Sequence, residues 1–466
     1  MTDIVVLVPG IMGSTLALNG TIIWPGTPTE YLFNSYPHFT ELLADHLEPK
    51  DVIRSVSIRD VYGSLLVGLR DCGFDEGLKP PTLYCCPYDW RKSNALAAER
   101  LASLVTQAVK EHGNEVRITL IAHSMGGLVA RYYLESDEFK GKDGFDKVVR
   151  LITLATPHRG APVALPAVLG LEKRVWLDAP QVQRLANDDR FPSLYELLPP
   201  RDEPFVWRSS AEGEHEPIDI HDDTIADRLR LNKNNLKKAR EFHERLDLRR
   251  RPNHVRYFAF GGTAHVTVSA VTLLSRDGGF EPQRVDPAKS GDETVPIWSA
   301  LLPGHQGLPV GGPHAHDVLF RDGNLRRTLA VLLGKKGVLA GEAEGVEVAL
   351  REHVVHPSQL VPVVLRLPPA SAPGARTGRL GFERASFDDK AQLQGYTRYG
   401  ATSPIRLTSQ AGAEDTLSVT VEAPDIKGAY RVAFFWGQDE PPAGQPEPPA
   451  GQDELFVQQP APVSPA

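Results

Sequence analysis

The chain has 466 residues, of which 41% are apolar and 24% charged, and these values are typical of a globular protein with a substantial core. The formal net charge of −8 does not favour nucleic-acid binding, which requires a basic surface. Three cysteines, Cys72, Cys85 and Cys86, are too few for a disulfide framework and favour a reducing compartment. The chain starts MTD and leads directly into an apolar run that is too short to cross a membrane. We therefore expect a soluble, cytoplasmic protein.

Strand and helix patterns alternate along the first 334 residues. Short apolar runs, typical of strands buried on both faces, lie at 4–8, 82–86, 116–122, 148–156 and 254–262. Helical apolar spacing lies at 60–71, 95–111, from Met125 onward and at 325–334. This alternation predicts an α/β fold with a doubly wound, mostly parallel sheet. The stretch from about 163 to 250 is polar and mostly helical in pattern, and we expect it to form a cap over the site.

The composition changes after Gly334. Strand-like runs separated by turn residues at 361–367, 404–409, 415–423 and 429–437 predict a small antiparallel β-sandwich. From 438 to the end the chain is rich in Pro, Gly, Ala and Gln, a composition that buries too little apolar surface to order itself. The expected domains are thus a catalytic domain at 1–340, a β-sandwich at 341–437 and a disordered tail at 438–466.

The stretch AHSMGG at 122–127 is similar to a nucleophile elbow, a sharp strand-to-helix turn that presents a serine hydroxyl. Ser124 follows an apolar strand pattern, and Gly126 and Gly127 open a helix. Small residues are needed at such a turn because strand and helix approach closely. Ala122 stands at the position of the usual first glycine and adds one methyl group. Ser124 is the candidate nucleophile.

The acid and the base of a serine triad follow downstream in the chain order of α/β-hydrolases. Asp292, in GDETVP, lies in a turn suited to a carboxylate that orients a histidine. His305, His314 and His316 come next, and the last two lie just before the final helix pattern. The backbone N–H of Met125 and one from the loop at 8–14 (VPGIMGS) are the candidate oxyanion donors.

Eight motifs in this order together resemble the lecithin:cholesterol acyltransferase family of the α/β-hydrolase superfamily, in a bacterial-type cytoplasmic form. They are VPGIMGS (8–14), Trp24-Pro25, PYDWR (87–91), AHSMGGL (122–128), LATPHRG (154–160), PSLYELLP (192–199), GDETVP (291–296) and HDVLF (316–320). The resemblance implies that Ser124 is the nucleophile, Asp292 the acid and His316 the base, with His314 as the alternative base. It also implies that Ile11 and Met125 supply the oxyanion N–H groups.

The resemblance also implies a lid, here the segment at about 25–60. Its residues Tyr31, Leu32, Phe33, Tyr36 and Phe39 either cover an acyl pocket or touch a lipid surface, or they form an ordinary packed loop. In PYDWR, we expect Trp90 to pack in the core and Asp89 and Arg91 to brace one another.

The sequence therefore predicts a serine esterase or lipase, similar to phospholipases and acyltransferases, that works through an acyl-serine intermediate. The expected partner is a lipid or other ester, with a membrane surface as a possible contact and no nucleic acid; no protein partner is identified. No metal or cofactor is expected. The alternative is an inactive hydrolase-like interaction protein that works through its β-sandwich.

Overall fold

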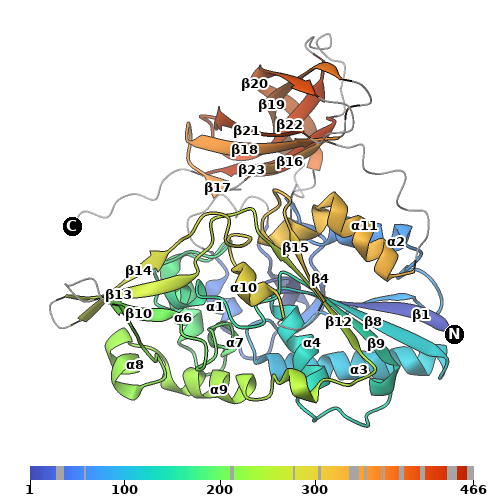
Figure 1. Ribbon diagram of the computed structural model, residues 1–466, viewed down its shortest axis with the longest axis vertical. Helices are drawn as coiled ribbons and strands as arrows, with labels where there is room; N and C mark the ends of the chain where they lie inside the picture. Colours follow the sequence, from blue (N-terminus) through green and yellow to red (C-terminus); the bar gives the residue numbers. More distant parts are fainter. Residues whose placement is uncertain are drawn as a thin grey trace.

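The computed structural model describes residues 1–27, 36–56, 59–209, 215–276, 279–302, 306–334, 346–350, 354–368, 370, 373–387, 393–409, 415–437 and 449–458. Figure 1 shows a larger α/β body and a smaller all-β part stacked on it.

Within this part of the chain, the body is built on a six-stranded sheet with the strand order β15-β12-β9-β8-β1-β7, and every strand pair in it is parallel. Its strands are β1 (Thr2–Val8), β7 (Leu83–Cys85), β8 (Val116–His123), β9 (Val148–Leu154), β12 (Arg256–Gly262) and β15 (Gln306–Val310). The predicted doubly wound parallel sheet is confirmed. The order of strands reverses at β1, because the chain passes from β1 to β7 on one side and then to β8 on the other.

Helices cover both faces of this sheet (Figure 1). Side chains alternate along β1, so that Val5 and Leu7 pack with α2 (Gly63–Asp71) and α11 (Gly323–Leu332). Ile4, Val6 and Val8 pack on the other face with α3 (Asn94–His112) and α4 (Met125–Glu135). Burial on both faces explains why these strands read as unbroken apolar runs.

Local sequence sets the ends of α3. Ser93 precedes it, and its hydroxyl accepts a hydrogen bond from the Ala95 N–H at 3.3 Å. Gly113 ends the helix with φ of +77°, a conformation that glycine adopts without a steric penalty. The predicted helix at 95–111 is therefore present with both of its end signals.

The segment from 163 to 250 is less purely helical than the prediction. It contains α5 (Ala164–Val168), α6 (Ala179–Ala186), α7 (Ser193–Glu196), α8 (Asp223–Leu229), α9 (Lys233–His243) and the 3-10 helix η3 (Leu248–Arg250). It also contains β10 (Val206–Ser209) and β11 (His215–Pro217), which join β13 (Ala270–Arg276) and β14 (Gly279–Val285) in a second sheet. These short strands form because β10 pairs with β13, more than 60 residues later, a partner that local pattern does not reveal.

The lid-like segment forms structure of its own. Its strand β4 (Glu48–Val52) joins β2 (Ser14–Leu18) and β3 (Thr21–Trp24), which precede the segment, in an antiparallel sheet. The pair β5 (Ser55–Val56) and β6 (Arg59–Asp60) follows. Tyr36 and Phe39, at the start of α1 (Phe39–Leu42), are buried in the main core. Tyr31, Leu32 and Phe33 lie outside the described residues.

The C-terminal part contains two facing sheets, with orders β16-β18-β21 and β17-β23-β22-β19-β20, around a core of its own. The strands are β16 (Glu347–Leu350), β17 (Val354–Val355), β18 (Leu360–Leu367), β19 (Gly374–Phe387), β20 (Leu393–Ser409), β21 (Asp415–Glu422), β22 (Gly428–Trp436) and β23 (Gly451–Val457). The pairs are antiparallel except β17 with β23, which is parallel.

The predicted disorder of 438–466 is wrong for residues 451–457, which form β23. Leu455, Phe456 and Val457 are fully buried, and β23 lies between β17 and β22. Three consecutive apolar residues, Leu455, Phe456 and Val457, offer enough apolar surface once a sheet edge is available, although the flanking composition is typical of disorder. Residues 438–448 and 459–466 lie outside the described part.

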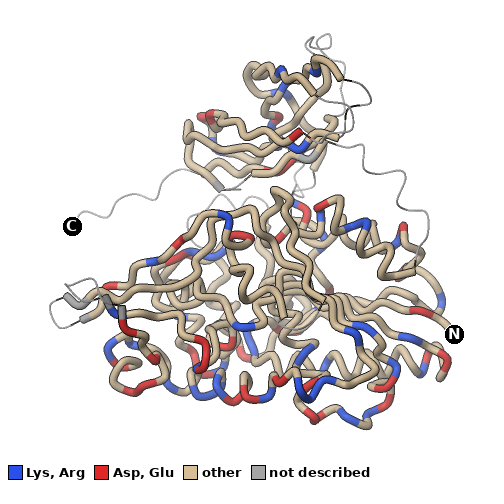
Figure 2. The backbone as a smooth tube through the Cα atoms, viewed as in Figure 1, with Lys and Arg blue, Asp and Glu red and all other residues tan. Residues whose placement is uncertain are grey.

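The remaining observations concern charge and cysteine. In Figure 2, backbone positions with Lys or Arg and those with Asp or Glu are interspersed along the helices of the body, so neither sign dominates there. Cys72, Cys85 and Cys86 are not joined by disulfide bonds, and Cys72 and Cys86 are buried. Among the described residues, no helix is both long and apolar enough to cross a membrane.

Candidate active site

Ser124 occupies a strained turn between β8 and α4. Its φ is +52°, a value that non-glycine residues rarely adopt and that costs on the order of 1–3 kcal/mol. The backbone around it is crowded: a Cβ on Gly126 would lie 2.4 Å from the Pro9 carbonyl oxygen, and a Cβ on Gly127 would lie 2.0 Å from Thr156 Oγ1. The methyl group of Ala122, in contrast, is accommodated in the buried sheet. The turn thus has the geometry of a nucleophile elbow.

Three side chains form one hydrogen-bonded series at this turn. His316 Nε2 lies 2.8 Å from Ser124 Oγ, and His316 Nδ1 lies 3.0 Å from Asp292 Oδ2. Asp292 is fully buried, and its Oδ1 accepts the N–H groups of Thr294 (3.1 Å) and Val295 (2.7 Å). These bonds hold the carboxylate so that its other oxygen faces the imidazole.

The fold assembles this series where the strand order of the sheet reverses. In open parallel sheets, ligand sites lie outside the carboxyl ends of the strands at such a point. Ser124 follows β8. Asp292 packs against Gly262 at the end of β12, so closely that a Cβ on Gly262 would lie 2.7 Å from Asp292 Cβ. His316 begins the 3-10 helix η4 (His316–Arg321), and its N–H donates to the Asp292 carbonyl at 2.9 Å.

The structure distinguishes the histidines considered in the sequence. His316 reaches Ser124, whereas His314 is buried and is not among the described residues that line the cavity beside Ser124. His305 lies outside the described residues. His158 is buried, and its Nε2 is 2.9 Å from Thr153 Oγ1.

The loop after β1 packs directly on Ser124. A Cβ on Gly10 would lie 2.8 Å from Ser124 Cβ, so only glycine allows this approach. Ile11 lines the cavity beside Ser124, and Met125 is the first residue of α4. The two residues expected to supply oxyanion N–H groups therefore flank the serine from two directions.

A second hydrogen-bonded series connects this loop to the histidine. Gly10 N–H donates to Tyr62 Oη (2.8 Å), Tyr62 Oη lies 2.9 Å from His123 Nδ1, and His123 Nε2 lies 2.9 Å from the His316 carbonyl. Because a carbonyl only accepts, Nε2 carries the proton. Burial, the main cause, lowers the pKa of His123 to about 3, so the ring is neutral and Nδ1 accepts from Tyr62. His123 is thus a buried histidine with both ring nitrogens hydrogen-bonded.

His265 connects the acid loop to the histidine loop. Its Nε2 donates to the Pro313 carbonyl at 2.7 Å, and its Nδ1 lies 3.1 Å from Glu293 Oε1. Burial lowers the pKa of His265, but the hydrogen bond and charge of Glu293, the Pro313 carbonyl and the charge of Asp292 outweigh burial, so the pKa is raised. When the ring is protonated it donates from both nitrogens, to the Pro313 carbonyl and to Glu293, and so connects the two loops.

We expect His265 to make stability fall as the pH rises. A raised folded-state pKa contributes stability that is fully present below the unfolded value of about 6.5 and is lost as pH rises through the folded value. Burial lowers the pKa of His123 to about 3 and of His243 to about 4, so both rings are neutral above pH 6 and do not contribute to this change. Urea denaturation from pH 6 to 9 measures the effect, with His265→Gln as the comparison. An unchanged pH dependence in that variant would rule out this role.

A cavity of about 440 Å³ opens beside Ser124 and His316. Its lining is largely apolar and includes Trp24, Val163, Trp176, Leu194 and Leu197, with Arg59, Lys173 and Arg174 as cationic members. Trp24 is fully buried and its ring contacts those of Tyr36, Trp90 and Trp176 at centroid distances of 5.0–5.5 Å. The cavity is suited to an apolar chain next to a polar head.

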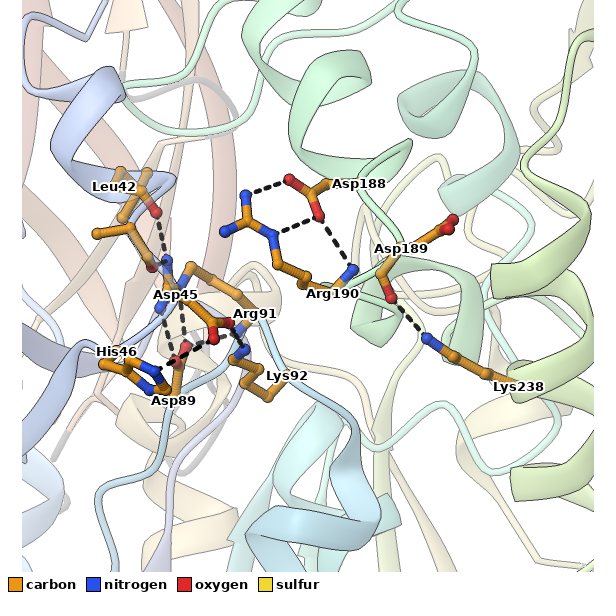
Figure 3. Close-up of polar contacts among 11 residues, drawn as sticks. Leu42, Asp45, His46, Asp89, Arg91, Lys92, Asp188, Asp189, Arg190 and Lys238 are labelled. Carbon is orange, nitrogen blue, oxygen red and sulfur yellow. Dashed lines mark hydrogen bonds and ion pairs between the residues drawn. The ribbon is translucent and has the colours of Figure 1, made fainter.

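The PYDWR motif joins the lid-like segment to the body (Figure 3). Arg91 binds Asp89 through two hydrogen bonds of 2.7 and 2.8 Å, which confirms that these residues brace one another. Arg91 also donates to the carbonyls of Leu42 and Ala44, just after α1. Trp90 is fully buried, as expected. The motif thus holds the end of α1 in place.

Sequence reasoning missed Tyr62 and His265. Tyr62 lies in a helical pattern, where an aromatic residue reads as core, and His265 lies in a segment without a recognisable motif. Each acts through partners more than 20 residues away, so no local signal was available.

The chain is similar to a known protein family and to two plant proteins. A family model for lecithin:cholesterol acyltransferase matches residues 57–263, a stretch that contains Ser124 and ends before Asp292 and His316. Lecithin-cholesterol acyltransferase-like 4 of Arabidopsis thaliana is 24% identical over 368 residues, which cover 67% of this chain and 65% of that protein. Phospholipase A(1) LCAT3 of the same plant is 29% identical over 181 residues, 36% of this chain and 38% of that protein.

The chain thus spans less than two thirds of the length of either relative. Among solved structures, the Tle4-Tli4 complex contains a chain with a TM-score of 0.53 and 14% identity, covering 72% of this chain and 98% of that one. At this identity the similarity concerns the fold.

Proposed function

This chain belongs to the lecithin:cholesterol acyltransferase family of the α/β-hydrolase superfamily, and from this we propose that it cleaves or transfers the acyl group of a lipid ester through an acyl-serine intermediate. The observation that carries the proposal is the series Ser124–His316–Asp292 beside a largely apolar cavity. In this proposal Ser124 is the nucleophile, His316 the general base and Asp292 the acid.

In the first half-reaction, Ser124 Oγ attacks the ester carbonyl while His316 Nε2 takes its proton. Asp292 stabilises the imidazolium through Nδ1 and stays ionised. The developing oxyanion is held by the backbone N–H groups of Ile11 and Met125. When the tetrahedral intermediate collapses, His316 returns the proton to the leaving alcohol, and the acyl group remains on Ser124.

In the second half-reaction an acceptor attacks the acyl-serine. Water gives hydrolysis and a free fatty acid, whereas an alcohol gives a new ester by the same steps. In both cases His316 takes the proton of the acceptor and returns it to Ser124 Oγ. The choice depends on which acceptor the cavity admits.

The proposed substrate class is a lipid with an acyl chain and a polar head. The apolar walls suit the chain, and the phospholipase A(1) relative is named for such a substrate. The charged residues of the lining are largely paired, Arg174 with Glu172 and Arg59 with Asp317, so the proposed substrate class does not depend on the charge of the head.

The proposal is tested with a fluorophosphonate and with vesicles of diacyl phosphatidylcholine. Mass spectrometry of the treated protein is expected to find the adduct on Ser124. Incubation with vesicles is expected to release fatty acid and lysophospholipid, and added long-chain alcohol diverts acyl groups to a new ester if transfer competes. An adduct on a different serine, or none, would reject the proposed site; labelling without lipid cleavage would reject the substrate class alone.

A further inference from the structure

The C-terminal β-sandwich contacts the body at the helical turn that carries His316. That turn, η4, ends at Arg321, five residues after the histidine. Arg321 Nη1 lies 3.2 Å from Asp453 Oδ1, and Nη2 lies 3.3 Å from Glu454 Oε2. Both carboxylates belong to β23, whose sequence neighbours are typical of a disordered tail.

The body holds the same turn from its other side. Arg321 Nε lies 3.5 Å from Asp60 Oδ2, and Asp60 Oδ1 accepts the Ser64 N–H at the start of α2. Asp317, next to the histidine, is paired with Arg59. Because Arg321 is only 16% exposed, its three carboxylate contacts are made largely out of solvent, where ion pairs are stronger and less screened.

A second arm reaches from the sandwich to the residue after η4. Arg366 Nη1, on β18, lies 3.1 Å from Asp322 Oδ2, while Asp322 Oδ1 accepts the Leu325 N–H as the N-cap of α11. The histidine loop packs on this pair, since a Cβ on Gly312 would lie 1.8 Å from Asp322 Oδ2 and 3.1 Å from Arg366 Nη2. The sandwich therefore holds the segment around His316 through two independent arms.

Apolar packing joins the two parts as well. Along β23, Leu455 and Val457 belong to the core of the sandwich, while Phe456 belongs to the buried cluster of the body. Phe456 is fully buried, and Ala429, its partner on β22, belongs to the same cluster. The strand is thus shared between two cores, which is expected of a fixed domain contact and not of a domain on a free tether.

We propose that the C-terminal β-sandwich is a positioning element for His316, with Asp453, Glu454 and Arg366 as the positioning residues. It rests on the proposed function, because it requires His316 to be the base. A displacement of about 1 Å in a catalytic group costs on the order of 100-fold in rate. Two arms that fix η4 therefore control the rate without touching the substrate.

The test uses the full chain and removes charge from one arm at a time. Asp453→Asn with Glu454→Gln, and separately Arg366→Gln, are expected to lower kcat on a short-chain chromogenic ester by about 10-fold or more. KM stays within two-fold, because the apolar walls of the cavity, such as Trp24 and Leu194, do not belong to η4. The rate of fluorophosphonate labelling at Ser124 falls by the same factor. Asp415→Asn is the matched control, since Asp415 is a partly buried carboxylate whose described partners, Arg376 and Ser409, lie within the sandwich.

The outcomes separate this inference from the proposed function. If Ser124 of the wild-type protein is not labelled, the proposed function fails and the inference falls with it. A second outcome is that the wild type is active, both arm variants keep kcat within two-fold of the wild-type value, and their Tm is no higher than that of Asp415→Asn. The inference then fails, while the triad stands. If the double variant does not fold, Glu454→Gln alone takes its place beside Arg366→Gln, and the same outcomes decide the inference.

Discussion

Replacing Ser124 with alanine is expected to lower kcat on any ester substrate by on the order of 10⁶-fold. The serine oxygen forms the covalent bond to the acyl group, and the serine hydroxyl is the group whose proton His316 Nε2 is placed to take. Binding of substrate in the apolar cavity is retained, so KM changes little. The loss is read from steady-state kinetics with short-chain and long-chain chromogenic esters.

Ser299→Ala is the control for this change. Ser299 is also a fully buried serine, and its hydroxyl donates to the Gly160 carbonyl at 2.5 Å. Its loss is expected to reduce stability by about 1 kcal/mol without a comparable loss in kcat. Equal activity of the wild type and Ser124→Ala on every ester tried would exclude the acyl-serine mechanism.

His316→Ala is expected to lower kcat by about as much as loss of the nucleophile, since members of a triad act as a unit. His314→Ala, two residues away, should keep kcat within about 10-fold of the wild-type value, because His314 belongs to the same loop but does not take the proton. The physical reason is the 2.8 Å contact from His316 Nε2 to Ser124 Oγ together with the 3.0 Å contact to Asp292.

The pair is compared by kcat and by the rate of fluorophosphonate labelling, with Tm to show that both variants fold. Labelling is expected to become very slow in His316→Ala and to stay close to wild type in His314→Ala. A large loss in His314→Ala with a mild one in His316→Ala would reverse the assignment of the base. Mild and equal losses in both would mean that neither histidine takes the proton.

Local pattern was sufficient for five of the six strands of the parallel sheet and for the candidate nucleophile; β15, at its edge, was not predicted. A strand buried on both faces must be apolar throughout, so runs such as 4–8 and 116–122 identify β1 and β8 without knowledge of their partners. The elbow is recognisable locally, because a serine followed closely by two glycines comes directly after a buried strand pattern and before a helix pattern. The crowding that requires Gly126 and Gly127, in contrast, comes from Pro9 and Thr156, which only the fold brings to the turn.

Local pattern failed where pairing over long distances supplies the stability. β10 lies in a stretch expected to be polar and helical, yet it pairs with β13. β23 lies in a segment typical of disorder, yet it pairs with β22, which ends at Trp436, and with β17, about 100 residues earlier. A short strand is not stable alone and depends on the edge that receives it. Composition therefore predicts the average behaviour of a segment and not its pairing.

The sequence by itself determined the α/β fold, the strained turn at Ser124 and the order in which a serine, an acid and candidate histidines follow one another. Only the tertiary structure decided that His316 and not His314 contacts Ser124, because two histidines of one loop share a local pattern and differ only in where the folded loop directs them. It also decided that Arg321 meets β23, over 130 residues later. Such contacts form between side chains that folding brings together, and no spacing in the sequence encodes them.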